Sequence, residues 1–327
     1  MQGGSWKLYV NGEDNMPQTP STEWVCRVPV TSVWTHPDKV REVDAYAIAN
    51  TPDINKWREA MNQQQTKDLT VSNRLQTQLL YGEPVVIDEI DGTWAKIIAP
   101  WQPSHKDERG YPGWVPLAHL KEIDSLSGRS YARVAADKAQ LWTPDRLPLM
   151  SIPFNSLLPV QDADETRVQV HTPDGDAYID TAHIELVPSP DQIPLGSGQS
   201  IVNTAERFLG LQYFWGGMSS FGYDCSGFSY HMLKASGLYI SRDAGDQSTE
   251  GVEIDRLDEA AWQIGDLLFF AYEEGLGKLH HVGIYYGQGM MIHSPTSGKA
   301  IEIIRLEGTV YDKELCAVRR FTQEETT

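Results

Sequence analysis

The 327-residue sequence predicts an α+β protein in which two small β-barrels precede a C-terminal domain of helices followed by a sheet. Three observations support this prediction. A strand–turn–strand pattern occurs twice in the first part of the chain. A Pro- and Gly-rich stretch at 187–198 is typical of a linker. The segment after it begins with helical periodicity and continues with short apolar runs.

The first barrel is predicted from residues 83–98, where two strand-like runs flank the Asp91-Gly92 turn. The segment Tyr111-Pro-Gly-Trp-Val-Pro116 follows, and an apolar stretch at 117–120 closes the unit. Residues 40–80 have helix-like spacing. We therefore interpret them as a helical insertion in the first barrel.

The second barrel is predicted from residues 167–179, which repeat the strand–turn–strand plan, with 184–187 closing it. Short strands, tight turns and a repeat of this size are typical of SH3-like barrels. The expected domains are therefore a first SH3-like barrel with its insertion at 1–124, a second at 125–190, and the C-terminal domain at 191–327.

The C-terminal domain is predicted to begin with two helices. Apolar residues at 201, 202, 205, 208 and 209 form one helical stripe, and Gly210 is a natural stop. A second helix is expected from Cys225 to Ser236, ended by Gly237. Strands are expected at 267–271, 282–286, 290–293 and 300–304.

Charge excludes several classes of partner. The chain has 27 Lys and Arg against 45 Asp and Glu, a formal net charge of −18, and no clustered basic run. Nucleic acids, anionic membranes and anionic wall polymers are therefore not expected partners. No stretch is long and apolar enough for a membrane helix, and Met1–Asp14 lacks the pattern of a signal peptide. We expect a cytoplasmic monomer, or an exported protein if a signal has been removed.

Cys225 is the candidate nucleophile. The chain has three cysteines, far apart, and Cys26 and Cys316 are interpreted as small buried residues. Cys225 follows a loop rich in Gly and Ser and begins an amphipathic helix. Unpaired N–H groups and the helix dipole at that position favour a thiolate, which is the nucleophile of cysteine hydrolases.

Two histidines supply the expected base and its orienting partner. Residues 279–294 are predicted to form a hairpin with its turn at 287–289, pairing Tyr286 with Met290 and Gly283 with His293. Strand alternation then places His281 and His293 on one face, with Gly283 leaving room for a ring. A base oriented by a second polar group follows the logic of catalytic triads.

A metal site is the main alternative for these side chains. A site built from His, His and Cys needs further ligands with tight geometry, and none is evident. Thiolate chemistry requires no cofactor, and we expect none.

The C-terminal domain resembles the NlpC/p60-type, papain-like cysteine peptidases. The resemblance rests on five blocks in matching order over about 199–322. The blocks are Tyr213-Phe-Trp-Gly-Gly, Asp224-Cys-Ser-Gly-Phe, Gly265-Asp-Leu-Leu-Phe-Phe, His281-Val-Gly-Ile-Tyr and Ile292-His-Ser. With two barrels in front, the whole chain resembles the subgroup of γ-D-glutamyl-L-diamino-acid peptidases. These act on muropeptides with a free N-terminal L-Ala and release L-Ala-γ-D-Glu.

The resemblance implies a catalytic triad of Cys225, His281 and His293. It also implies an oxyanion-stabilising role for Tyr213, for which a packed aromatic residue is the alternative. The same blocks assign Asp224, Ser226 and Trp215 to the substrate site. Asp224 could instead serve only as a helix N-cap.

The resemblance further implies a subsite for the free amino group, made by Glu83, Tyr111 and Asp243. The first barrel would then close one end of the cleft and exclude longer chains. Three alternatives stay open: amidase or acyltransferase chemistry on the same scaffold, and a wall-binding protein that uses its barrels. The sequence does not distinguish diaminopimelate from lysine at the third position.

Overall fold

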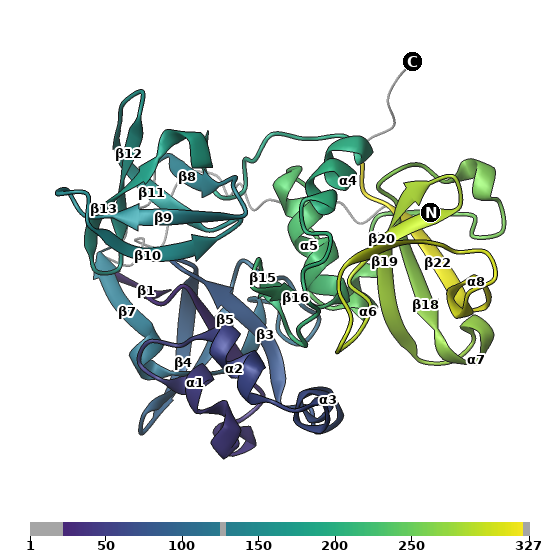
Figure 1. Ribbon diagram of the computed structural model, residues 1–327, viewed down its shortest axis with the longest axis horizontal. Helices are drawn as coiled ribbons and strands as arrows, with labels where there is room; N and C mark the ends of the chain where they lie inside the picture. The colour runs from purple at the N-terminus through teal and green to yellow at the C-terminus, as the bar shows by residue number, and fades with distance from the viewer. Residues whose placement is uncertain (1–21, 125–128, 323–327) are drawn as a thin grey trace, which may run out of the picture.

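The computed structural model describes residues 22–124 and 129–322. The Met1–Asp14 segment and the expected boundary between the two barrels at 124–125 lie wholly or partly outside these residues. The described chain forms two seven-stranded β-barrels and a third domain with a six-stranded sheet. Figure 1 shows the barrels on one side of the molecule and the third domain on the other.

The first barrel contains the hairpin predicted around Asp91-Gly92. Its strands are β1 (Thr22–Cys26), β2 (Val30–Trp34), β3 (Leu75–Leu80), β4 (Pro84–Asp91), β5 (Trp94–Ala99), β6 (Tyr111–Pro116) and β7 (Leu120–Asp124). They pair in the order β3-β2-β6-β5-β4-β1-β7. Alternating side chains of these strands, including Val33, Leu79 and Ile97, form the barrel's own core.

The helical insertion is shorter than the sequence predicted. It contains α1 (Ala45–Ile48), α2 (Ile54–Ala60) and α3 (Gln63–Val71), whereas residues 75–80 form strand β3. The helical interpretation of 75–80 was wrong because this segment pairs with β2 as a strand, in which every residue except Gln76 is buried. Trp57 of α2 packs edge-on against Phe214 of the third domain, with ring centroids 5.1 Å apart. The insertion therefore joins the first barrel to the third domain.

The second barrel repeats the first strand for strand. Its strands are β8 (Tyr131–Val134), β9 (Lys138–Trp142), β10 (Pro148–Pro153), β11 (Leu157–Ala163), β12 (Arg167–Thr172), β13 (Gly175–Asp180) and β14 (Ile184–Val187). Their order, β10-β9-β13-β12-β11-β8-β14, is the order of the first barrel with seven added to each number. The predicted internal repeat is therefore a repeat of topology.

The third domain places two helices against an antiparallel sheet. Its helices are α4 (Gly198–Glu206), α5 (Cys225–Ala235), α6 (Ala244–Gln247), α7 (Tyr272–Gly275) and α8 (Val310–Glu314). Its strands are the short pair β15 (Met218–Ser219) and β16 (Gly222–Tyr223), then β17 (Val252–Ile254), β18 (Leu267–Ala271), β19 (Leu279–Gly287), β20 (Met290–His293), β21 (Glu302–Arg305) and β22 (Leu315–Arg320). The larger sheet has the order β17-β22-β18-β19-β20-β21, and α4 and α5 bury their apolar side chains with it in one core.

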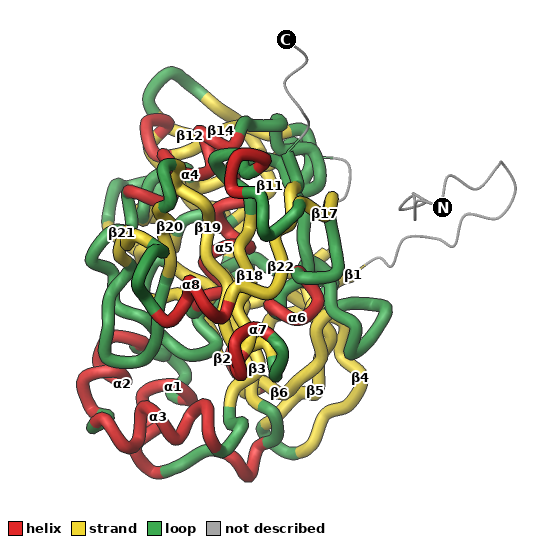
Figure 2. Tube along the Cα trace, turned by 90° about the vertical axis from the view of Figure 1, so that its right-hand side faces the viewer, coloured by secondary structure: helices red, strands yellow, loops and turns green. Residues whose placement is uncertain are grey.

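Helix α5 lies at the centre of the molecule, between the barrels and the large sheet (Figures 1 and 2). Its Tyr230 hydroxyl donates to the Trp101 carbonyl of the first barrel at 2.6 Å. The Asn155 amide of the second barrel donates to the His231 carbonyl at 2.9 Å. Both barrels therefore hold the helix that begins at Cys225.

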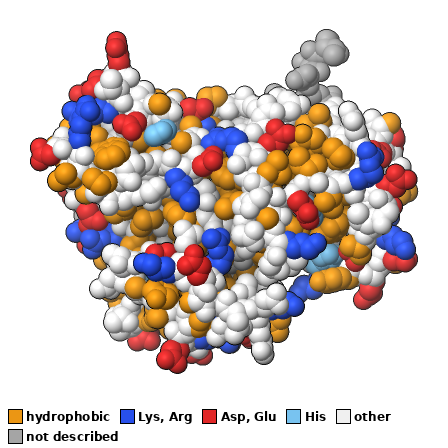
Figure 3. Space-filling model, in the orientation of Figure 1, with side chains coloured by type: hydrophobic (Ala, Val, Ile, Leu, Met, Phe, Trp, Pro, Cys, Tyr) orange, Lys and Arg blue, Asp and Glu red, His pale blue; other side chains and the backbone are white. Residues whose placement is uncertain are grey.

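The surface in Figure 3 carries basic side chains scattered among acidic ones. Within residues 22–124 and 129–322, no helix is long and apolar enough to cross a membrane.

Candidate active site

Cys225 is the first residue of α5, as predicted. Asp224 is the N-cap, and its carboxylate accepts a hydrogen bond from the Gly227 amide at 2.7 Å. Gly227 allows the helix to start against the preceding loop, because a Cβ there would lie 2.1 Å from the Gly217 oxygen. The nucleophile is therefore fixed by a cap and by a close backbone approach.

Burial of the thiol opposes the effect of the helix start. Burial raises the pKa of Cys225 to about 12, and the neighbouring Asp224 charge acts in the same direction. The backbone amide of Val282 and Arg242 oppose this shift but do not overcome it. The helix dipole favours a thiolate, whereas burial favours the protonated thiol. A base that takes the thiol proton would therefore assist attack by Cys225.

The histidines come from β19 and β20. Tyr285 pairs with Met291, but the predicted pairing of Tyr286 with Met290 was wrong, because a bulge places Gly287 opposite Met290. The bulge lies on the turn side of Tyr285, so it leaves the register near the histidines unchanged. A Cβ at Gly283 would lie only 3.3 Å from the Cβ of His293, so the glycine keeps this space open.

His281 and His293 are in direct contact. The Nε2 atom of His281 lies 2.8 Å from Nδ1 of His293, and both side chains are buried. Burial, followed by the nearby His293 and His280, holds the pKa of His281 well below its usual range. Burial also lowers the pKa of His293 to about 4. Both rings are therefore neutral near pH 7, as a base and its orienting partner require.

The contact between the rings also constrains their tautomers. If His281 Nε2–H donates to His293 Nδ1, His281 keeps a free lone pair on Nδ1, and His293 carries its proton on Nε2. The Nε2 atom of His293 is buried and makes no hydrogen bond to a described residue, but Glu302 Oε1 lies 3.8 Å away. The Glu302 carboxylate favours a proton on this nitrogen, and hence the tautomer that leaves His281 able to accept a proton.

Aromatic rings enclose the pair. Tyr311 of α8 lies 5.1 Å from the His281 ring and 5.3 Å from the His293 ring, measured between centroids. Phe270 stacks on His281 at 5.8 Å. Sequence reasoning missed Tyr311 because it lies outside the blocks that carry the resemblance.

Tyr213 and Trp215 belong to one sequence block but have different surroundings. The Tyr213 side chain is buried, and burial, followed by the interaction with Cys225 and Asp224, holds the pKa of its phenol well above the usual range. Trp215 packs against the apolar cluster that the first barrel and its insertion form with Phe214. The role of Trp215 in the substrate site stays a prediction.

Asp243 and Tyr111 meet across the boundary between the third domain and the first barrel. The Tyr111 hydroxyl donates to the Asp243 carboxylate, with Oη 2.9 Å from Oδ2 and 3.0 Å from Oδ1. Lys106, from the loop between β5 and β6, also reaches this carboxylate, with Nζ 3.0 Å from Oδ2. The two residues predicted to recognise an amino group thus already hold an ammonium group of the chain.

Glu83 lies at the far end of a buried polar chain. Its carboxylate accepts from the Leu80 amide at 2.9 Å and from the Gln102 side chain at 2.7 Å. Burial raises its pKa, while the charge of Lys234 opposes the shift. Both of these hydrogen bonds lie within the first barrel, and neither joins Glu83 to Asp243 or Tyr111.

Arg242 connects this chain to the nucleophile. Thr77 donates to Gln102 at 2.6 Å and accepts from Arg242 Nε at 3.0 Å. The same guanidinium donates to Asp224 at 2.6 Å and to Ser226 at 2.8 Å. Asp224 is therefore both a helix cap and one half of a buried ion pair. Sequence reasoning missed Arg242, although it stands directly before Asp243.

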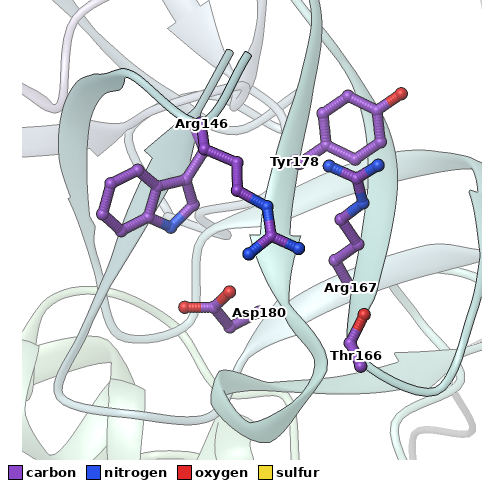
Figure 4. A pocket seen from close by; sticks show the side chains of 6 residues that line it. Arg146, Thr166, Arg167, Tyr178 and Asp180 are labelled. Atoms are coloured by element: carbon purple, nitrogen blue, oxygen red, sulfur yellow. The ribbon is translucent and has the colours of Figure 1, made fainter. Parts of the chain in front are cut away.

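Two further candidates for a functional role are a metal site and a cavity on the second barrel. Across residues 22–124 and 129–322, no group of three or more His, Cys, Asp or Glu could hold a metal ion. A cavity of about 300 Å³ on the second barrel, shown in Figure 4, contains none of the predicted site residues. It is lined by Trp142, Arg146, Thr166, Arg167, Tyr178 and Asp180.

Comparison with known proteins gives the family. Residues 210–320 match the NlpC/P60 family, and residues 134–186 match the YKFC SH3b2 domain. The chain is 41% identical over 295 residues to the γ-D-glutamyl-L-lysine dipeptidyl-peptidase of Bacillus subtilis, covering 90% of this chain and 97% of that protein. The chain belongs to the NlpC/P60 family of cysteine peptidases.

Two further relatives extend this result. The γ-D-glutamyl-L-lysine dipeptidyl-peptidase of Bacillus cereus is 35% identical over 300 residues, which cover 90% of this chain and 89% of that protein. The crystal structure of an NlpC/P60 family protein from Bacillus cereus superposes with a TM-score of 0.86 at 34% identity. The match covers 92% of this chain and 100% of that one. The three-domain arrangement is therefore shared along nearly the whole chain.

Proposed function

We propose that this protein hydrolyses the bond between γ-D-glutamate and a diamino acid in peptidoglycan peptides that begin with a free L-Ala. The names of the two Bacillus relatives and the family support a peptidase acting on such peptides. The observation that carries the finer proposal is the contact between Tyr111 and Asp243. This contact holds the Asp243 carboxylate beside Arg242. Arg242 in turn binds Asp224, the residue before the nucleophile.

In the proposed mechanism, the sulfur of Cys225 attacks the γ-carbonyl carbon of D-glutamate, and its proton passes to Nδ1 of His281. A neutral thiol suits this concerted transfer, because the proton leaves as the carbon–sulfur bond forms. Negative charge then develops on the carbonyl oxygen. The unpaired amide groups at the start of α5 and the Tyr213 hydroxyl are the donors that would stabilise it.

Collapse of this intermediate breaks the carbon–nitrogen bond. His281 gives its proton to the departing amino group of the diamino acid, leaving a thioester on Cys225. Water then attacks the thioester carbonyl while His281 takes a proton from it, and the proton returns to the sulfur as the dipeptide leaves. His293 keeps the His281 ring in the required orientation and tautomer throughout.

Selection of the free amino terminus follows from charge. An α-ammonium group can replace the cation now bound by Asp243, whereas an acetylated amide cannot. In this proposal the first barrel forms the end of the cleft beyond this point, which limits the substrate to two residues before the cleaved bond.

The test is cleavage of L-Ala-γ-D-Glu-L-Lys and its diaminopimelate analogue, each with and without an N-acetyl group. We expect the free peptides alone to release L-Ala-γ-D-Glu, and Cys225→Ala to abolish release. Equal cleavage of free and acetylated peptides would refute the proposal that the site selects a free amino group. No cleavage of either would favour an amidase or acyltransferase.

A further inference from the structure

Lys106 occupies a site with the properties of an ammonium receptor. Its Nζ atom pairs with Asp243 at 3.0 Å and donates to Gln76 Oε1 at 2.8 Å. It also contacts the Tyr111 hydroxyl and lies 4.2 Å from the centre of that ring. An ammonium group has three donors, and here it meets a carboxylate, an amide oxygen and a phenol. These are the groups that a peptide's α-ammonium would need.

The Lys106 side chain is able to leave this site without unfolding the loop. The backbone beside it is held separately, because Arg242 N donates to the Pro103 carbonyl and His105 N donates to Asp246. The side chains of Lys106 and Asp243 are 42% and 33% exposed, so water can solvate both groups after separation. By contrast, the Arg242 and Asp224 side chains are only 2% and 7% exposed.

We propose that Lys106 is an internal competitor for the amine subsite, and that the substrate's α-ammonium group binds by displacing it. This inference rests on the proposed function, because that function assigns Asp243 and Tyr111 to the amine. Binding then exchanges one cation for another at the same carboxylate. A substrate with a neutral, acetylated amino terminus has no cation to replace Lys106 at the Asp243 carboxylate. Lys106 therefore stays bound and blocks the subsite.

The test measures binding of the dipeptide L-Ala-γ-D-Glu to the full chain carrying Cys225→Ala, by titration calorimetry. Lys106→Gln in this background removes the competing charge and keeps a side chain of similar length. Lys121→Gln removes one charge from an exposed position on β7 and serves as the matched control. The N-acetylated dipeptide is titrated into all three proteins.

We expect Lys106→Gln to bind the free dipeptide about two- to five-fold more tightly, the change that loss of a half-exposed ion pair would cause. Lys121→Gln should bind like the parent protein. An unchanged or weaker affinity in Lys106→Gln would overturn the role of Lys106, with the amine subsite left intact. Equal affinity of the parent protein for the free and acetylated dipeptides would overturn the amine subsite itself, and this inference with it.

Discussion

Replacement of Arg242 by Met tests the buried chain that connects the first barrel to the nucleophile. The guanidinium makes three side-chain hydrogen bonds of 2.6–3.0 Å, to Asp224, Ser226 and Thr77. Methionine fills similar space but leaves Asp224 buried without its cation. Removing one partner of a buried ion pair costs about 3–5 kcal/mol. We therefore expect the free energy of unfolding to fall by about this amount.

Urea unfolding, followed by tryptophan fluorescence, gives this free energy. Arg27→Met is the control, because it removes the cation of another Arg–Asp pair, Arg27–Asp174, whose side chains are 39% and 37% exposed. Loss of such a pair costs about 0.2–1 kcal/mol. Asp224→Asn combined with Arg242→Met should recover part of the loss, since asparagine still caps α5 without a buried charge. A loss under 1 kcal/mol in Arg242→Met, or a double variant no more stable than the single one, would refute the reasoning.

Three further predictions concern the histidines. His293→Ala should lower kcat by roughly 10²–10⁴-fold with little change in KM, because His281 loses its orientation while the amine subsite is untouched; steady-state kinetics would show a KM effect instead if His293 bound substrate. Glu302→Gln should lower kcat by roughly three- to ten-fold by removing the charge that favours a proton on His293 Nε2, and an unchanged kcat would contradict this role. The acid limb of the kcat/KM profile should lie below pH 6.5, because burial lowers the pKa of His281 and the base is lost only when that ring is protonated. The alkaline limb should follow the substrate's α-amino group, near pH 8; an acid limb above pH 6.5 would show that His281 is not the base or is not buried during turnover.

Local sequence patterns predicted the parts of the fold that local interactions determine. The helix start at Cys225, the stop at Gly237 and strands such as Leu267–Ala271 were predicted correctly from caps, glycines and apolar runs. Residues 75–80 were misread as helical, because their role as a strand depends on pairing with distant β2. The bulge at Tyr286 was missed for a similar reason, since periodicity alone does not reveal an extra residue in one strand.

The candidate site was predictable where it depends on motifs and not where it depends on burial. His281 and His293 were placed on one face by strand alternation, and they do meet. The motif at Cys225 predicts a thiolate but does not reveal the burial that raises the pKa of this thiol, because the degree of desolvation is a property of the packed molecule. Arg242 and Lys106 were missed because their carboxylate partners, Asp224 and Asp243, are not their neighbours in a local motif, so no local pattern distinguishes them from surface charges.

Two aspartates near the nucleophile show how burial divides one residue type between two roles. Asp224 is held by Arg242 in a pair almost closed to water, and the same carboxylate caps α5. Asp243 holds Lys106 in a pair that water reaches, so its cation can be exchanged. Replacing the cation of a buried ion pair would cost several kcal/mol, which is more than the binding of one peptide ammonium group could offset. The proposed selectivity for a free amine therefore requires the partly exposed carboxylate, and Asp224 cannot substitute for Asp243.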